Sequence, residues 1–426
     1  MRALFFFYIQ ENRYSLNALL GAVEDLLSER TDTAIYFFKN GKDLIQGVES
    51  FGSDFQEIII LISLHTPQFW TVKSLIAELR SLKIRAKLTL IGGGPHASAL
   101  PKNTLDLGFD FVFVGEAEES FRAFLESYRN GNEALPLIKG LACYIDGNYF
   151  FSGKAKPVDL KRFAPFSLRF GKISPIEITR GCPFVCKYCQ TPRLFGTKIR
   201  HRSIEDILFY AEALLKRGIR DLRFITPNAF SYGSEDGKTL NVEALRTLLR
   251  ELYLLSRIYG GRIYFGSFPS EVRPEHVTEE TITLVKTFCH NDNLVIGAQT
   301  GSEPMLTYIR RDHSLEDVRK AVDLTLKAGL KIKVDFIFGL PEETEEDVKA
   351  TLSFMEELAK KGAIIHAHTF MPLPQTPFMR KPAGRISPEV FHFIRRFLPK
   401  GQIFGHWQKQ MELAKRIERE ILGELS

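Results

Sequence analysis

The feature that most constrains the fold is an alternation of short apolar runs with amphipathic, helix-length stretches, which occurs twice along the 426-residue chain. Parallel strands need crossover connections that are usually helices, so this alternation is typical of parallel α/β sheets. In the first set we predict strands at residues 4–9, 33–38, 57–63, 88–91 and 109–114. Five such units predict a doubly wound α/β domain over residues 1–134, with ligands at the carboxyl ends of the strands.

A second set of strands is predicted at residues 176–179, 222–226, 262–265, 293–299, 331–338 and 364–370. Six strand–helix units are too few for a closed eight-stranded barrel, so they predict a partial barrel over residues 175–377. Residues 135–174, rich in proline and glycine, predict a linker with a short β excursion. Residues 378–426 have helical periodicity and predict a C-terminal helical segment that packs on the barrel.

We expect a cytoplasmic protein. The N-terminal apolar run ends before Gln10, which is too short for a signal peptide, and no apolar stretch reaches the roughly 18 residues of a transmembrane segment. Clustered cysteines in the cytosol indicate metal binding or catalysis rather than disulfides. The net charge is +6, but the basic residues are scattered and no basic run interleaved with aromatic residues indicates a nucleic-acid surface.

Three of the five cysteines, Cys182, Cys186 and Cys189, lie within eight residues as CxxxCxxC, directly after the first strand of the second set. A structural zinc site takes four protein ligands. An iron–sulfur cube also takes four, so three thiolates would leave one iron open to a small molecule that chelates through an amine and a carboxylate. Zinc with a distant fourth ligand is the alternative. Cys143 and Cys289 stand alone, and we expect them to be small buried hydrophobes.

Two loops of the first set also stand out. Gly92, Gly93 and Gly94 follow the fourth strand, and Gly115 and Glu116 follow the fifth. Consecutive glycines remove side chains from a strand end, so a bulky ligand can lie against bare backbone. A tight turn is the alternative. Because a proline follows the third glycine, a dinucleotide site of the GxGxxG type is disfavoured.

In this context the chain resembles the cobalamin-dependent radical SAM enzymes. CxxxCxxC with an aromatic residue before the last cysteine resembles the cluster motif of that family. Residues 298–306, 335–347 and 370–377 resemble, in order, its fourth-, fifth- and sixth-strand segments. The GGGPHAS and GEAEESF blocks resemble its Rossmann-like, cobalamin-binding half.

The resemblance implies three cofactors: a 4Fe-4S cluster on the three cysteines, S-adenosyl-L-methionine and cobalamin. The cobalamin residues that it implies are Ser63, His65, Gly92, Gly93, Gly94, Gly115 and Glu116. The S-adenosylmethionine residues that we predict are Tyr188, Asn228, Gln299, Thr300, Gly301, Gly339 and Phe370.

The chain departs from the family pattern in two places. The stretch from Tyr8 to Tyr14 carries no histidine where other cobalamin domains have Asp-x-His-x-x-Gly, which implies a cofactor with its own base detached and its lower face covered by a side chain or by nothing. His65 is the histidine that could reach cobalt, although a loop histidine is more often a hydrogen-bonding neighbour. Residues 226–230 replace the usual amine-binding segment, and there Asn228 is either an acceptor or a turn residue.

The resemblance implies that an electron enters the cluster and cleaves S-adenosylmethionine to a 5'-deoxyadenosyl radical. This radical removes a hydrogen atom from an unactivated carbon, which then receives a methyl group from methylcobalamin. A carbon methyltransferase is therefore the favoured function. The alternative is a cobalamin-containing enzyme that rearranges, cyclises or couples carbon without methyl transfer.

A methylthiotransferase is disfavoured, because that family carries three more cysteines in its N-terminal domain and residues 1–142 contain none. A non-enzymatic cobalamin-binding module would not need the cluster motif. We expect a substrate that is a small or lipid-like molecule rather than a nucleic acid. We also expect an electron donor such as ferredoxin or flavodoxin.

Overall fold

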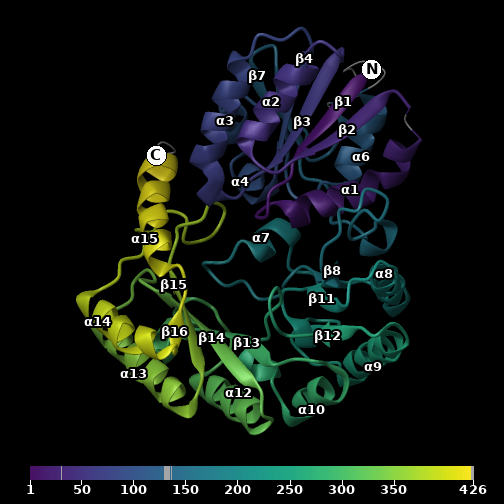
Figure 1. Cartoon of the computed structure of the whole chain (residues 1–426). Helices are drawn as coiled ribbons and strands as arrows, with labels where there is room; N and C mark the ends of the chain where they lie inside the picture. Colours follow the sequence, from purple (N-terminus) through teal and green to yellow (C-terminus); the bar gives the residue numbers. More distant parts are fainter. Residues whose placement is uncertain (30, 129–134, 136, 424–426) are drawn as a thin grey trace. The chain divides into compact units, whose positions relative to one another are not determined.

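The computed structural model of the chain describes residues 1–29, 31–128, 135 and 137–423. It divides into two compact units, Met1–Ser174 (unit 1) and Pro175–Ser426 (unit 2) (Figure 1). Residue 134, the predicted end of the first domain, and residues 424–426, the end of the predicted C-terminal segment, lie outside the described residues.

Unit 1 contains a seven-stranded sheet in the order β2-β1-β3-β4-β5-β6-β7. Its strands are β1 (Arg2–Phe7), β2 (Thr33–Phe38), β3 (Glu57–Ser63), β4 (Lys87–Gly93), β5 (Phe111–Phe113), β6 (Leu141–Ile145) and β7 (Asn148–Phe151). The first five strands are parallel, and β6 and β7 are antiparallel to their neighbours. The order 2-1-3-4-5 is a doubly wound topology whose switch point lies between β1 and β3. The predicted fold class is therefore confirmed for this unit.

Helices cover both faces of this sheet. They are α1 (Arg13–Ser28), α2 (Gly41–Phe51), α3 (Phe69–Ser81), α4 (Gly94–Ala99), α5 (Pro101–Asp106) and α6 (Glu118–Ser127), with short 3-10 turns η1 (Thr66–Gln68) and η3 (Leu160–Arg162). The α2 helix begins where the Asn40 side chain accepts a hydrogen bond from Asp43 N, which satisfies one of the free N–H groups of the first turn.

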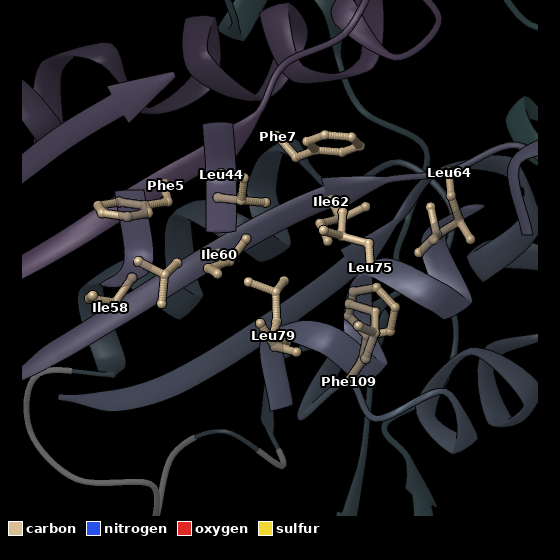
Figure 2. Packing of buried hydrophobic residues seen from close by; sticks show 14 of the residues in the cluster. Phe5, Phe7, Leu44, Ile58, Ile60, Ile62, Leu64, Leu75, Leu79 and Phe109 are labelled. Atoms are coloured by element: carbon tan, nitrogen blue, oxygen red, sulfur yellow. The ribbon is translucent and has the colours of Figure 1, made fainter. Parts of the chain in front are cut away.

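The core of unit 1 has two layers because strand side chains alternate between faces. Phe5, Ile58 and Ile60 pack against α2 and α3, and Figure 2 shows this layer. Leu4 and Ile59 point to the opposite face and pack against α1 and α6. Each fully buried side chain of this size stabilises the fold by about 1.5–3 kcal/mol, so both faces anchor the strand ends that carry the glycine loops.

The segment that we predicted as a linker with a short β excursion contributes two strands to unit 1. Its hairpin forms β6 and β7, and β6 pairs with β5. Ser152 Oγ donates to Leu141 O, and Leu141 N donates back to Ser152 Oγ. The limits of the domains as we predicted them stay predictions.

Unit 2 is built from parallel strands in two groups, β12-β11-β8 and β13-β14-β15-β16, with a small antiparallel pair β9-β10. The strands are β8 (Ile176–Glu177), β9 (Thr179–Arg180), β10 (Arg200–His201), β11 (Asp221–Ile225), β12 (Arg262–Tyr264), β13 (Asn293–Gln299), β14 (Lys331–Phe338), β15 (Ile364–Thr369) and β16 (Ile403–Phe404). A parallel bridge between Val272 and Ile296 joins the two groups. The result is the partial barrel that the strand pattern predicts.

The longer helices of unit 2, apart from the last one, lie along the outer side of its strands (Figure 1). They are α8 (Ile204–Lys216), α9 (Val242–Tyr259), α10 (Glu279–Phe288), α12 (Leu315–Lys327), α13 (Glu345–Lys361), α14 (Pro388–Phe397) and α15 (Trp407–Arg416). The shorter ones are α7 (Thr191–Phe195), η4 (Ala229–Ser231), η5 (Pro274–His276), α11 (Glu303–Tyr308), η6 (Leu398–Lys400) and η7 (Ile417–Leu422). Side-chain caps at Ser203, Thr278, Ser314 and Thr344 fix where four of the helices begin.

The C-terminal segment does more than cover the barrel. Its short strand β16 adds to β15, and α15 is fixed to the end of β15, where Thr369 Oγ1 donates to Trp407 O at 2.8 Å and Thr369 N donates to Gln410 Oε1 at 2.9 Å. Gln410 is thereby held at the carboxyl end of the barrel strands. In the part of the chain that the structure describes, no helix is both long and apolar enough to cross a membrane.

Candidate functional site

The cysteine loop follows β9 directly and is folded back on its neighbours. Cys182 N donates to Gly196 O at 3.1 Å, and Lys187 N donates to Ile309 O at 3.0 Å. Gly181 has a φ of +88°, and a Cβ there would lie 2.3 Å from Lys198 O. Glycine is therefore required for the close approach of two backbones that places the three thiols.

The thiols lie in a poorly solvated environment. Burial, followed by the neighbouring thiols, raises the pKa of Cys182 to about 11. Burial also raises the pKa of Cys189. Thiolates are the metal-binding form, so metal binding at this loop releases protons and is favoured by rising pH.

All three thiols face one cavity of about 430 Å³ at the carboxyl ends of the unit 2 strands. Residues from the strand ends and from α15 line the rest of it: Phe184, Tyr188, Thr191, Thr226, Pro227, Asn228, Pro269, Glu271, Val272, Arg273, Gln299, Arg311, Asp335, Ile337, His368, Thr369, Phe370, Met371, Leu373 and Gln410. The free cysteines Cys143 and Cys289 are not among the lining residues.

A buried guanidinium group lies beside the thiols. Arg311 Nη2 donates to Gly297 O at 2.9 Å, and Arg311 Nη1 lies 3.9 Å from Cys186 Sγ. Its Nε has no hydrogen-bond partner among the described residues. Gln299, at the end of β13, has a φ of +73° and lines the same cavity. The carboxyl end of β13 therefore presents an amide near a guanidinium that has an unused donor.

Acidic and imidazole groups form a second polar cluster at the wall of the cavity, which Asp335 and His368 line. His366 Nδ1 lies 2.9 Å from Asp335 Oδ1 and 3.2 Å from His368 Nε2. Gln410 Nε2 lies 3.2 Å from His368 Nδ1. Burial, followed by the charge of His366, lowers the pKa of His368 to about 4, so His368 is neutral at pH 7.

Glu271 extends this cluster toward the cysteines. Its side chain is accessible from the cavity, but the surrounding protein removes most of its hydration. This desolvation, together with the nearby Asp335 carboxyl, raises the pKa of Glu271 to about 7. Two carboxyl groups in contact cannot both be ionised at low cost, so the pair holds a proton near neutral pH.

The structure brings together seven of the residues predicted for unit 2. Cys182, Cys186, Cys189, Tyr188, Asn228, Gln299 and Phe370 all line the cavity. The polar atoms of Asn228 already have protein partners: Nδ2 is 2.6 Å from His276 Nδ1, and Oδ1 accepts from Arg273 N at 3.2 Å. Asn228 therefore holds the loop that carries Arg273.

Three predicted residues lie elsewhere. Thr300 Oγ1 is 3.0 Å from Thr351 Oγ1, and Gly301 N donates to the same hydroxyl, so both residues pack against α13. Gly339 packs against the backbone of Arg385, whose N would lie 2.5 Å from a Cβ on that glycine. None of the three is among the residues that line the cavity.

In unit 1, a buried amide occupies the switch point of the sheet. Asn12 Nδ2 donates to Phe7 O at the end of β1 and to Ser63 O at the end of β3. Asn12 Oδ1 accepts from Ile9 N. Asn12 thus fixes the loop in which other cobalamin domains carry a histidine.

The predicted cobalamin residues separate into two groups. Ser63 pairs with Gly93 across the strand ends, and its buried Oγ has no partner among the described residues. A Cβ on Gly93 or Gly115 would meet nothing within 4 Å of it. Gly93 and Gly115 therefore each have free space at the carboxyl edge of the sheet, and Ser63 lies buried beside Gly93.

The other four predicted residues have structural partners. A Cβ on Gly92 would touch Thr104 and Phe109, and one on Gly94 would collide with Ser63 and Leu64. His65 N donates to Gln68 Oε1, and burial lowers the pKa of the His65 imidazole. Glu116 Oε2 accepts from Val158 N at 3.1 Å, which fastens the segment before unit 2.

Sequence analysis did not identify Asn12, Glu271, Arg273, Arg311, Asp335, His368 or Gln410 as site residues. Asp335 and His368 lie on barrel strands, and Glu271, Arg273 and Arg311 lie in segments that follow barrel strands, so charged residues on and after these strands were the available signal. Gln410 had no comparable signal, because it comes from a helix far along the chain.

Two family models match the chain. Residues 16–125 match the B12 binding domain, and residues 176–355 match the radical SAM superfamily. The B12-binding match lies within unit 1, and the radical SAM match lies within unit 2. The chain belongs to the cobalamin-dependent radical SAM family. The cofactor set predicted from the sequence, a 4Fe-4S cluster, S-adenosylmethionine and cobalamin, is that of this family and is confirmed.

Other members of the family, and one uncharacterised relative, show how far the similarity extends. An uncharacterised protein of Methanocaldococcus jannaschii is 29% identical over 369 residues, which cover 75% of this chain and 69% of that protein. The radical S-adenosylmethionine methyltransferase TsrM of Kitasatospora setae, solved with tryptophan substrate and a SAM analogue, is 17% identical with a TM-score of 0.69 over 89% of this chain and 75% of its own. The cobalamin-dependent S-adenosylmethionine radical enzyme OxsB is 16% identical with a TM-score of 0.66 over 83% of this chain and 51% of its own.

At these identities the two solved structures show a shared fold. Whether this chain can hold the family's cofactors depends on the residues at its own two sites. In unit 2 the cavity offers three thiols and a buried guanidinium with an unused donor. In unit 1 the strand ends offer side-chain-free space and an unpartnered hydroxyl. Both arrangements suit the groups that the family binds.

Gly93 has room for a side chain and the adjacent Gly94 does not, so replacing each by alanine should affect stability differently. Gly94→Ala should destabilise unit 1 by about 2–4 kcal/mol, because Gly94 has a φ of +91° and a Cβ would lie 2.6 Å from Ser63 Oγ. Gly93→Ala should change stability by less than about 1 kcal/mol, since nothing lies within 4 Å. Urea unfolding followed by Trp70 fluorescence in a Trp407→Phe background measures both. Equal losses in the two variants would contradict the assignment of free space to Gly93.

Proposed function

We propose that this cobalamin-dependent radical SAM enzyme is a methyltransferase that places a methyl group on an unactivated carbon of a small molecule. The observation that carries the proposal is the convergence of three thiols, Gln299 and Arg311 on one cavity, in a chain whose other unit leaves free space at Gly93 and Gly115. Methyl transfer is favoured over rearrangement because the similar fold of TsrM belongs to a methyltransferase.

Cys182, Cys186 and Cys189 would hold the 4Fe-4S cluster and leave one iron free for the amine and carboxylate of S-adenosylmethionine. Arg311 is suited to the carboxylate, because a guanidinium pairs with carboxylates in a planar fork and its Nε has no partner among the described residues. The amide of Gln299 and the rings of Tyr188 and Phe370 would position the rest of that molecule in the cavity.

Gly93 and Gly115 would lie against cobalamin, with the hydroxyl of Ser63 as a hydrogen-bonding neighbour. His65 is tied to Gln68, which supports a role in shaping the loop rather than in binding cobalt. When bound, the cofactors supply a radical that removes a hydrogen atom from the substrate and a methyl group that replaces it. The cavity residues bind, orient and exclude water.

The proposal includes a low-potential electron donor such as ferredoxin or flavodoxin and a cytoplasmic location. A cavity of about 430 Å³ suits a small-molecule ligand. The substrate that is named for TsrM, tryptophan, is itself a small molecule. Rearrangement, cyclisation or coupling without methyl transfer is the alternative outcome of the test below.

Labelled S-adenosylmethionine tests the reaction. Anaerobically reconstituted enzyme, supplied with methyl-labelled S-adenosylmethionine, a reductant and a metabolite extract of the host, should transfer label first to bound cobalamin and then to a metabolite. Formation of 5'-deoxyadenosine with consumption of a metabolite but no labelled product would reject methyl transfer in favour of the alternative.

The cluster ligands are tested by single cysteine changes. Alanine at Cys182, Cys186 or Cys189 should remove the 4Fe-4S absorption and abolish reductive cleavage of S-adenosylmethionine, because the cluster needs all three thiolates. Cys143→Ala and Cys289→Ala are matched controls and should keep iron content and spectrum. Loss of the cluster in either control would show that the ligand set is wrong.

The cobalamin residues are tested by filling their space. Gly93→Leu should lower cobalamin retention at least tenfold while iron content stays unchanged, because the side chain occupies the free volume at the strand end. Gly147→Ala, in the turn between β6 and β7, is a control for glycine replacement in the same unit. Full retention of cobalamin by Gly93→Leu would remove this loop from the site.

A further inference from the structure

A second buried arginine lies next to the cysteine loop. Arg273 is 4% exposed, and its guanidinium carbon lies 3.4 Å from the ring centroid of Phe184. Phe184 stands between Cys182 and Cys186 in the sequence and is itself buried. A cation stacked so closely on a side chain of the loop is held in one position relative to the thiols.

The hydrogen bonds of Arg273 leave one donor unused. Its Nη2 donates to Arg311 O, and its Nε donates to Glu275 Oε1. Its Nη1 has no partner among the described residues. The backbone is fixed as well, because Arg273 N donates to Asn228 Oδ1. Such a buried cation is expensive to maintain unless a negative group compensates for it.

The carboxylate of Glu275 offers incomplete compensation. Its Oε1 accepts from Arg273, while its Oε2 has no hydrogen-bond partner among the described residues. The Glu275 side chain is 21% exposed, against 4% for that of Arg273. Arg273 lines the same cavity as the three thiols, whereas Glu275 is not among its lining residues, so the pair leaves a net positive field on the side of the thiols.

From this arrangement we infer that Arg273 is a positioning residue that sets the reduction potential of the cluster on Cys182, Cys186 and Cys189, and that Glu275 acts in the opposite direction. The inference rests on the proposed function, since it requires the cluster. The step concerned is the gain of one electron by the cluster from an external low-potential donor, without making or breaking a covalent bond.

The direction follows from Coulomb's law. Reduction makes the cluster and its thiolates more negative by one charge, so a nearby buried cation stabilises the reduced form more than the oxidised form. Arg273 should therefore raise the potential and ease electron entry. Glu275 should lower it, by a smaller amount because this side chain is more exposed.

Three variants test this inference through the midpoint potential, measured by an anaerobic titration with dithionite followed by the paramagnetic signal of the reduced cluster. Arg273→Gln should shift the midpoint to a more negative value. Glu275→Gln should shift it to a less negative value. Arg273→Lys, which keeps the charge, should lie close to the wild type. Opposite signs for the two neutral variants separate a charge effect from loosened packing, which would not reverse sign.

The matched control is Arg319→Gln, because Arg319 also forms an ion pair with a glutamate of unit 2 but lies on α12 and contacts Glu357 of α13. Its potential should equal that of the wild type. Each titration is done without and then with S-adenosylmethionine. A shift that is present without it shows that Arg273 acts on the cluster and not through the bound molecule. Loss of S-adenosylmethionine binding in Arg273→Gln with an unchanged midpoint would overturn the inference and make Arg273 a ligand-binding residue instead.

Failure of the proposed function gives a different result. Wild-type protein that assembles no cluster would reject the cysteine assignment itself. A wild-type cluster with normal iron content, but the same midpoint in Arg273→Gln, Glu275→Gln and wild type, would leave that assignment intact and reject only the role of Arg273.

Discussion

Parallel strand pairing in unit 2 determines which side chains meet in the cavity. The register places Gly297 opposite Asp335 and Asp335 opposite His366, so one row of residues crosses β13, β14 and β15. The pairing is irregular between Gly297 and Gln299, so Gln299 pairs with Phe336 rather than with Ile337, which a regular register would give. A one-residue slip would turn the acidic and imidazole side chains to the outer face, and the cavity would lose its chemistry.

This register also separates charge within a small volume. Arg273 and Arg311 lie beside the thiols, whereas Asp335, Glu271 and the histidines gather near the β15 end. Buried charges destabilise a fold unless partners compensate for them. The cavity keeps several groups whose partners are incomplete, which is typical of sites built for a ligand rather than for stability.

Sequence reasoning found the elements far better than their contacts. The limits predicted for β13 and β14 coincide with the observed ones, because long apolar strands between capped helices leave little freedom. The three glycines looked equivalent in the sequence, but the backbone gives only Gly93 free space. Asn12 and Arg311 act through partners more than 10 residues away, and no local pattern encodes such pairings.

The amide of Gln410 has a chemical consequence for the histidines. Because Thr369 N–H occupies Gln410 Oε1, the amide must present its NH₂ group to His368 Nδ1. Neutral His368 then carries its proton on Nε2 and offers it to His366 Nδ1. That nitrogen then accepts from His368 and cannot at the same time donate to Asp335. A glutamine on a distant helix thus selects the imidazole tautomer, and a metal ion held among Asp335, His366 and His368 would meet a nitrogen that already carries a proton.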